Sequence, residues 1–581
     1  MLALPFRHEG DDRETRRLRR IRAWQRRRSW WVLALFAVFL GLTIGAIQAS
    51  LAGLQLARGR DDLVAGRFQQ ADAEFTDARD GLHHNPLLGL VGLVPAARRQ
   101  VDALELLADM GARASHAARL GVAAVRGQDL GRLRQVQQEL ARLSADRARI
   151  PSAGLAPPIR QAVAQFDRRY AQAAAALPLL PLVNLLVGNG TASYLVMQQD
   201  PAELRPAGGF IGSVAFLDFD HGTMRPFNPV DVEVIDGPHH RRVLGVVGAP
   251  NYVPPPAPLR RVLDPGDSWE LRDENFSPDF PTSARLAESL LQRETGRRVQ
   301  GVIAVDPYLV ADLLTITGPV RVPQTGDVLT AENFFETTLR RVELHRGPTP
   351  RKSFLTEATG AVLDRFKTMP AASWSQIPTV LEQACRTKHL QAYFDDPAAE
   401  AVATQYGCGG QVPVFRQDGL LVVDTNLSSN KDDFWISRSF RLNLDRRSDG
   451  VTRHTLSIAY GPYPSLQQLT TPYYDWLRVY LPSGARLVAA SGVDQAGQSA
   501  ELGNALIQGW VHFDSGQTRT ISIVYDLPST PTRGDGALDL QWLKQAGRDA
   551  DPVVVTVAPA NAAPGATLTT DLRQDRVITG S

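Results

Sequence analysis

The feature that most constrains this sequence is a charge-free stretch, Ser29 to Ala57, directly after an arginine-rich N-terminus. Residues 1–28 carry ten Arg and four acidic side chains, a net charge of +6, which leaves −4 for the remainder of a chain whose formal total is +2. The apolar core from Trp30 to Ile47, at about 1.5 Å per residue, would span most of a hydrocarbon layer of roughly 30 Å. Because the cations precede it, the positive-inside rule predicts a single-pass transmembrane helix over 29–57. It also predicts a basic cytoplasmic segment over 1–28, with the bulk of the chain extracytoplasmic.

Two other interpretations of this stretch stay open. It could be a buried core helix, although it has no polar stripe and carries Trp30 and Trp31 where an interfacial aromatic belt would lie. It could also be a cleaved signal peptide, because Ser50-Leu51-Ala52 is an acceptable small-x-small cleavage site. The long charged segment before it favours an uncleaved anchor in the cell membrane.

Composition excludes several classes of protein. The 581 residues are 44% hydrophobic and 21% charged, which is typical of a globular chain with about three or four folding units. A disordered or disulfide-framework protein is excluded. The near-neutral balance argues against a nucleic-acid partner, which would require a broad excess of cations. Only five of the 63 cations are lysines, which we interpret as codon bias.

The chain has two cysteines, Cys385 and Cys408. Outside the cytoplasm these residues would meet an oxidising environment, so we expect a disulfide between them. A catalytic cysteine or a metal pair is the alternative, but His389 alone cannot complete a metal site.

Hydrophobic periodicity predicts a multidomain chain. A helical stalk or bundle is expected over 58–183, where apolar residues recur at three to five positions. Strands alternate with helices over 184–413, which predicts an α/β core domain. The period changes to two over 414–559, which predicts a C-terminal antiparallel β-sandwich, and 560–581 is expected to be a flexible tail.

The run from Gln199 to Ser213, between two expected strands, is the first candidate site. Gly208 and Gly209 would let backbone N–H groups approach an anion, and Arg205 could grip a phosphate with its two-pronged guanidinium. The alternative is a tight turn in which Arg205 pairs with Asp200 or Glu203.

Two further charged clusters are candidates. Before an expected helix, Arg272 could bind phosphate, while Asp273 and Asp279, with Asp200, could hold Mg²⁺. Alternatively, Asp279 caps the helix and Arg272 pairs with Asp273 at the surface. A third cluster includes Arg351 and Lys352, also candidate phosphate ligands, although such runs are usually solvated helix faces.

Four sequence motifs together resemble a family of bacterial, membrane-anchored extracytoplasmic proteins described as a domain of unknown function. They are AELRPAGGFIGS, LRDENFSPDFPTSA, GVIAVDPYLVADLL followed by TGPV, and DTNLSSNK at Asp424 to Lys431. The resemblance covers residues about 50 to 530. It implies a location in the cell envelope and an architecture, and it supplies no activity.

The order of elements is also remotely similar to the LytR-CpsA-Psr enzymes, which attach glycopolymers from polyprenyl-pyrophosphate carriers to peptidoglycan with Mg²⁺. In this resemblance Asp200 and Arg205 match pyrophosphate-binding positions, and Arg351-Lys352 would lie near a third. The sequence departs from that pattern, because Gly-Gly-Phe-Ile replaces an Arg-Ser-Asp-Thr run and Arg-Lys replaces an Arg-Gln pair.

Two functions therefore stay open. In the first, the chain binds, or transfers as an Mg²⁺-dependent phosphotransferase, a polyprenyl-linked or other phosphorylated glycan or cell-wall polymer at the bilayer surface. In the second, it is a non-catalytic envelope scaffold for protein partners in polysaccharide or export machinery.

Overall fold

The computed structural model describes residues 50–84, 88, 94–126, 130–151, 153–174, 190–243, 252–264, 266–344, 353–369, 373, 376–466, 470–528, 538–558 and 566–580. The chain divides into two compact units. A helical unit includes the described residues up to 124 and from 132 to 174, and a larger unit includes the described residues among 125–131 and from 190 onward.

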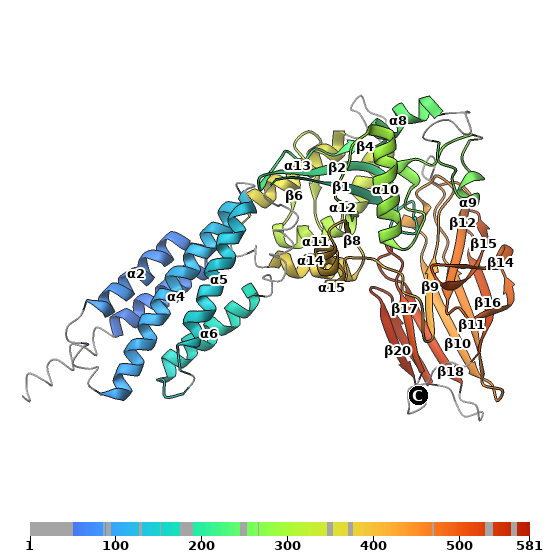
Figure 1. Ribbon diagram of the computed structural model, residues 1–581. Helices are drawn as coiled ribbons and strands as arrows, with labels where there is room; N and C mark the ends of the chain where they lie inside the picture. The colour runs from blue at the N-terminus through green and yellow to red at the C-terminus, as the bar shows by residue number, and fades with distance from the viewer. Residues whose placement is uncertain are drawn as a thin grey trace, which may run out of the picture. The chain divides into compact units, whose positions relative to one another are not determined.

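The first unit is helical, as the periodicity predicts. Residues 50–64 are helical, and the helices that follow are α2 (Phe68–His83), α4 (Pro95–Arg126), the short η1 (Leu130–Arg132), α5 (Leu133–Ala148) and α6 (Pro157–Ala174) (Figure 1). The buried side of α2 is formed by Ala71, Phe75, Ala78 and Leu82, which recur every three or four residues. The Phe75 ring packs where a β-carbon on Gly111 of α4 would lie, so this glycine permits the close contact between α2 and α4.

The predicted transmembrane helix is not supported. Of the helices within the described residues, none is both long and apolar enough to cross a membrane. The helical stretch 50–64 carries Arg58, Arg60, Asp61 and Asp62, and such charges are costly in a hydrocarbon layer. Residues 1–49, including most of the predicted span 29–57, lie outside the described residues. This finding corrects the fold class predicted from the sequence.

The larger unit begins with a mixed sheet in the order β3-β2-β1-β5-β8, with β4 also pairing with β2. Its strands are β1 (Thr191–Asp200), β2 (Phe210–Asp220), β3 (Thr223–Met224), β4 (Val230–Asp231), β5 (Gly301–Val305) and β8 (Leu390–Phe394). β1 and β5 are parallel, while β1/β2 and β5/β8 are antiparallel.

Helices cover both faces of this sheet. The helices and short turns of the domain are α8 (Val232–Val243), α9 (Ala257–Arg260), η2 (Leu271–Asp273), α10 (Phe280–Thr295), α11 (Pro307–Thr317), α12 (Phe334–Leu344), α13 (Ser353–Thr368), α14 (Ile377–Arg386) and α15 (Pro397–Gln405). Phe280, Ala284 and Leu291 of α10 pack on Leu195 and Met197 of β1. On the other face, Ala399 and Ala403 of α15 pack near Tyr194 and Phe394.

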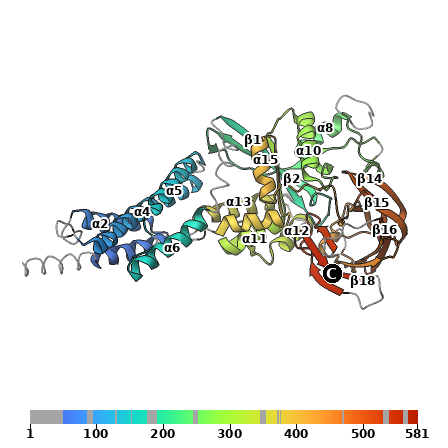
Figure 2. The same ribbon diagram turned by 60° about the horizontal axis from the view of Figure 1, so that its bottom comes forward.

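A separate small core lies beside the sheet. It is formed by α11, α12 and α13, which Figure 2 shows near one another, and by the hairpin of β6 (Val320–Arg321) and β7 (Val328–Leu329). The buried residues Leu314, Phe334 and Phe354 come from α11, α12 and α13 respectively. This part of the domain therefore has its own apolar cluster.

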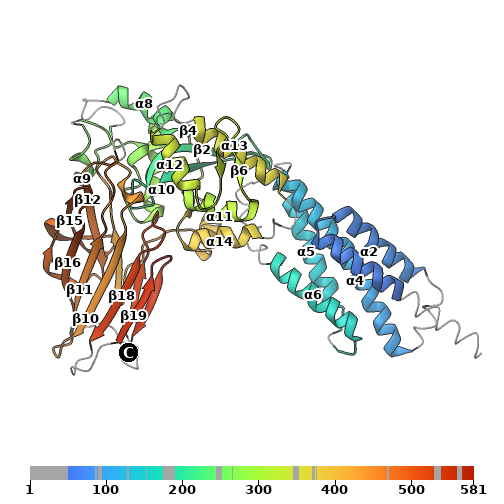
Figure 3. The same ribbon diagram turned by 180° about the vertical axis from the view of Figure 1, so that it is seen from behind.

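The C-terminal part consists of two six-stranded sheets, in the orders β13-β16-β11-β10-β18-β19 and β14-β15-β12-β9-β17-β20 (Figures 1 and 3). The strands are β9 (Gly419–Val423), β10 (Arg438–Arg446), β11 (Val451–Tyr460), β12 (Tyr473–Leu481), β13 (Arg486–Ser491), β14 (Asp494–Glu501), β15 (Asn504–Phe513), β16 (Arg519–Pro528), β17 (Leu538–Leu543), β18 (Pro552–Ala558), β19 (Ala566–Asp571) and β20 (Arg576–Gly580); the short η4 spans Asp432–Phe434. Alternate residues such as Phe440, Leu442 and Leu444 are buried in one shared core, as the period of two predicts.

Two expectations for this sandwich differ from the structure. Both sheets are mixed, because β10 pairs with β18 and β9 pairs with β17 in parallel. In addition, most of the expected tail 560–581 is structured, since β19 and β20 within it pair with β18 and β17. β19 and β20 therefore each add a strand to one of the two sheets, and the sandwich reaches residue 580.

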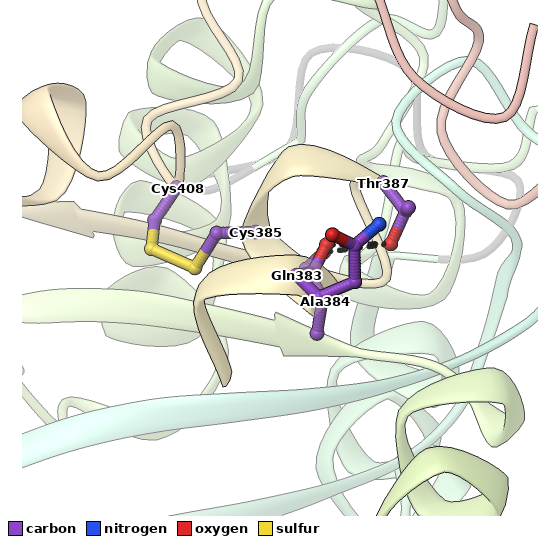
Figure 4. The surroundings of a disulfide bond; sticks show 5 residues. All are labelled: Gln383, Ala384, Cys385, Thr387 and Cys408. Atoms are coloured by element: carbon purple, nitrogen blue, oxygen red, sulfur yellow. Dashed lines mark hydrogen bonds between the residues drawn. A yellow bond between two sulfur atoms is a disulfide. The ribbon is translucent and has the colours of Figure 1, made fainter. Parts of the chain in front are cut away.

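The predicted disulfide between Cys385 and Cys408 is confirmed. Figure 4 shows it at the C-terminal end of α14, near the Thr387 hydroxyl, which donates a hydrogen bond to the Gln383 carbonyl at 2.9 Å. The Cys408 carbonyl also accepts a hydrogen bond from Ala392 of β8. The bond therefore joins α14 to the segment that follows α15.

Reducing this disulfide should lower the free energy of unfolding by roughly 3 kcal/mol, because it closes a loop with a sequence separation of 23. We expect a lower melting temperature for the wild-type chain in dithiothreitol. The double variant Cys385→Ala/Cys408→Ala is the control, since its melting temperature should not respond to reductant. An equal response of both chains to reductant would contradict a stabilising role.

Candidate functional site

The glycine-containing run that follows β1 forms a compact turn leading into β2. The Phe210 amide donates a hydrogen bond to the Glu203 carbonyl at 2.9 Å, and the Gly208 amide donates one to the Arg205 carbonyl at 3.0 Å. These bonds bring the end of β1 and the start of β2 together and leave the side chains of Glu203 and Arg205 pointing into the protein, where both are buried.

Both glycines of this run are explained by close packing. Gly208 has a φ of +139°, and the Gln199 amide occupies the place of a β-carbon there. Likewise, the Asp200–Pro201 backbone lies where a β-carbon on Gly209 would be. Ala207 also forms a bridge to Ala546, which follows β17. The two glycines thus let the turn pack closely against the end of β1, and the Ala207 bridge links the turn to the sandwich.

The guanidinium of Arg205 is buried and already paired. It donates to Glu203 Oε1 at 2.9 Å, to Asp273 Oδ1 at 3.1 Å and to the carbonyl of Asn426. Its side chain is 5% exposed. Asp273 belongs to the second charged cluster and Asn426 to the DTNLSSNK motif, so Arg205 links three motifs that are distant in the sequence.

Asp200 and Glu203 share a second cation, Lys431. Its Nζ lies 3.0 Å from Asp200 Oδ2 and 3.1 Å from Glu203 Oε2. Burial disfavours the charge, but these two carboxylates outweigh it and raise the pKa of Lys431 above its ordinary value. Lys431 is therefore a permanent positive charge at neutral pH.

Asp433 completes the arrangement from the sandwich side. It accepts hydrogen bonds from the Leu204 amide at 3.0 Å, the Asn426 side chain at 2.7 Å and the Tyr473 hydroxyl at 2.8 Å. Burial raises the pKa of Asp433 to about 6, although these bonds favour its charged form. We call the set formed by Asp200, Glu203, Arg205, Asp273, Asn426, Lys431 and Asp433 the core–sandwich junction.

A second buried ion network lies within the sandwich, next to this junction. Arg438 is paired with Asp424 at 2.7 Å and with Asp551 at 2.6 Å, and all three side chains are nearly inaccessible. Burial alone would raise the pKa of Asp551, but Arg438 and Arg548 lower it to about 2. The motif DTNLSSNK thus contributes to both networks, through Asp424 to Arg438 and through Asn426 and Lys431 to the junction.

Arg272 lies in a strongly acidic setting. It contacts Glu270 and Glu233, the latter at 3.0 Å, and Asp236 at 3.8 Å. Burial raises the pKa of Glu270 to about 8, and Arg272 only partly offsets this. Burial and the adjacent Asp236 also raise the pKa of Glu294. Arg272 is therefore the shared cation of several carboxyl groups, and some of the carboxyl groups in this cluster are protonated at neutral pH.

The three candidate Mg²⁺ ligands do not form one site. Asp200 faces Lys431, and Asp273 faces Arg205. Asp279 caps α10, accepting from the Thr282 amide at 3.2 Å, and also accepts from the Val412 amide at 3.0 Å. Their oxygens are committed to cations and N–H donors, which does not suit Mg²⁺. Among the residues that the structure describes, no three His, Cys, Asp or Glu are grouped to hold a metal.

The structure brings Arg205 and Asp273 together, and Lys431 and Glu203 link Asp200 to Arg205. Arg272 lies beside Asp273, with Arg272 Nε 3.8 Å from Asp273 Oδ2. Gly208 and Gly209 belong to the same turn as Arg205, whereas Asp279 caps α10. Arg351 and Lys352 lie outside the described residues.

Sequence reasoning missed the partners supplied by the sandwich, above all Asn426, Lys431 and Asp433. The sequence does carry one signal for these partners, which is that lysine is rare in this chain. Three of the chain's five lysines, Lys388, Lys431 and Lys544, lie between the core domain and the sandwich, with at most 12% exposure. Besides Lys431, Lys544 donates to the Thr387 carbonyl at 2.7 Å, and Lys388 donates to the Lys544 carbonyl at 2.8 Å.

The segment that supplies most of these core residues matches a protein-family model. Residues 189–342 match the model described as "Protein of unknown function (DUF4012)". The match includes the turn of Arg205, the cluster of Arg272 and helix α10, and it ends before the sandwich. A search of curated proteins finds no match.

Solved structures give only weak likenesses. A putative nutrient binding protein from Legionella pneumophila is 10% identical over 28% of this chain and 70% of its own, with a TM-score of 0.19. An M1 zinc metallopeptidase from Deinococcus radiodurans is 12% identical over 25% of this chain and 42% of its own, with a TM-score of 0.14. Similarities at this level carry no argument about fold or function.

Proposed function

We propose that this chain is a non-catalytic interaction protein of an oxidising, extracytoplasmic compartment, where its core domain and sandwich act as one clamped binding unit. The observation that carries this proposal is the state of Arg205. The residue best placed by sequence to grip a phosphate is buried, and its guanidinium is used by Glu203, Asp273 and the Asn426 carbonyl. The disulfide supports the choice of compartment.

The charges around the candidate phosphate ligands favour this proposal over binding of a polyprenyl-phosphate carrier. A pyrophosphate near Arg205 would meet the carboxylates of Glu203 and Asp273, and one near Arg272 would meet Glu270 and Glu233. Like charges at such distances cost free energy unless further cations neutralise them. The remote similarity to LytR-CpsA-Psr enzymes, and with it a phosphotransferase activity, is the competing hypothesis.

Titration calorimetry with farnesyl diphosphate, with and without Mg²⁺, separates the two functions. We expect no saturable heat with the wild-type chain. The matched variant is Arg272→Gln, because this side chain is a quarter exposed and lies outside the junction as defined above. Saturable binding that Arg272→Gln abolishes would contradict the proposal, as would mass spectrometry showing polyprenyl phosphates co-purified with the wild type and lost from the variant.

A further inference from the structure

The outer face of one sandwich sheet carries an aromatic strip. Tyr474 pairs with His512 and Trp476 with Trp510 across the β12/β15 ladder. Side chains alternate along a strand, so these four lie opposite the buried Tyr473, Leu477, Val511 and Phe513. We call Tyr474, Trp476, Trp510 and His512 the aromatic strip.

The strip consists of two ring pairs. The rings of Tyr474 and His512 are stacked, with centroids 5.9 Å apart and planes 17° apart. Trp476 and Trp510 meet edge to face at 5.0 Å. Tyr474 is 49% exposed, whereas the two Trp side chains are partly buried against Leu259 and Leu427. The exposed pair thus extends from a pair that is anchored in the protein.

Hydrogen-bonding groups of opposite charge border the strip. His512 Nδ1 lies 2.9 Å from Asp494 Oδ2 on β14. Arg261, just after α9, lies over the Trp510 ring at 5.4 Å and donates to Gln495 Oε1 at 3.1 Å. An acid and a base therefore flank Trp510, and together they add no net charge.

Backbone irregularities place these polar groups. The β14/β15 register shifts between Asp494 and Gly497, and Gln495 has a φ of +55°, which is uncommon for a residue with a side chain. Gly509 of β15 lets β14 approach, because a β-carbon there would lie 2.9 Å from the Asp494 carbonyl oxygen. Bulges of this kind re-aim side chains at binding sites.

The DTNLSSNK loop fixes the exposed end of the strip. The Tyr474 amide donates to Ser428 Oγ at 2.6 Å, and the Tyr474 carbonyl accepts from the Leu427 amide at 2.9 Å. The loop that supplies Asn426 and Lys431 to the core–sandwich junction therefore also holds the start of β12. The strip is a pre-organised surface, which lowers the cost of binding.

We propose that the aromatic strip binds an uncharged polysaccharide. A sugar ring has an apolar C–H face that suits the exposed Tyr474 and His512 rings, and its hydroxyls can donate to Asp494 and accept from Arg261 and Gln495. The balanced charge favours a neutral ligand over a polyanion. A protein partner would need a larger continuous apolar area than one half-exposed tyrosine beside partly buried tryptophans. This site goes beyond the proposed interaction function, and its failure would leave that function standing.

Affinity electrophoresis of the full chain through native gels containing dextran, glucomannan or xylan tests the proposal. We expect at least one polysaccharide to retard the wild type. Tyr474→Ala and His512→Ala should each raise the dissociation constant derived from the retardation by about tenfold, since each removes one ring of the exposed pair. Tyr474→Phe keeps the ring and should retain most of the retardation.

Tyr406→Ala, which removes a partly exposed tyrosine after α15, is the matched control and should migrate like the wild type. Equal retardation of wild type and Tyr474→Ala would overturn the proposal, as would a lack of retardation by every polysaccharide. A co-purifying protein that Tyr474→Ala loses, without any retardation of the wild type, would overturn it too and assign the strip to a protein partner.

Discussion

Replacing Arg205 by alanine is expected to lower the free energy of unfolding by about 3–5 kcal/mol, the range found when one partner of a buried ion pair is removed. The loss is large because Glu203 and Asp273 would stay buried without their shared cation. The Asn426 carbonyl would lose its donor as well. Because Arg205 of the core domain binds the loop before β10, we expect its loss to weaken the contact between the core domain and the sandwich.

Differential scanning calorimetry and limited proteolysis measure this effect. Arg205→Ala should melt at a lower temperature than the wild type and be cut faster between the core domain and the sandwich. Arg447→Ala is the control, because Arg447 is 42% exposed and pairs with Asp449 at 3.5 Å, so its loss should change the free energy of unfolding by less than about 1 kcal/mol. A melting temperature for Arg205→Ala equal to that of Arg447→Ala would rule out a stabilising junction.

Local patterns predicted the elements well. The period of two over Phe440, Leu442 and Leu444 gave a strand whose alternate residues are buried. Asp279 was one candidate cap of the helix that follows it, and it does cap α10, since it accepts from the Thr282 amide. Such signals depend on neighbours a few residues apart, which a sequence displays directly.

Long-range pairing was not accessible in the same way. Arg205 and Asn426 are 221 positions apart, and Leu204 and Asp433 are 229 apart. Arg205 beside two glycines resembles an anion site until the buried acids around it are known. The parallel pairs β9/β17 and β10/β18 are equally non-local. The composition of residues 560–581 suggested a tail, although these residues contain β19 and β20.

The acids around Arg272 give the second large expected effect, which concerns pH. Burial raises the pKa of Glu270 to about 8, and burial together with Asp236 raises that of Glu294. In the unfolded chain both would titrate near 4.3. Between these values the folded state holds protons that the unfolded state has released, so stability falls as pH rises. The stabilisation is complete below about pH 4 and, for Glu270, is lost as pH rises through about 8.

We therefore expect the melting temperature of the wild-type chain to decrease from pH 6 to pH 8, with up to about 1.4 kcal/mol lost per pH unit for each such group. Glu270→Gln should flatten this decrease, because the amide keeps an oxygen for Arg272 and cannot ionise. Glu382→Gln is the matched control, since Glu382 is 42% exposed in a surface pair with Arg386 and should leave the pH profile unchanged. Parallel profiles for the wild type and Glu270→Gln would mean that Glu270 is ionised throughout. Arg272 would then neutralise Glu270 fully, and this carboxyl group would hold no proton at neutral pH.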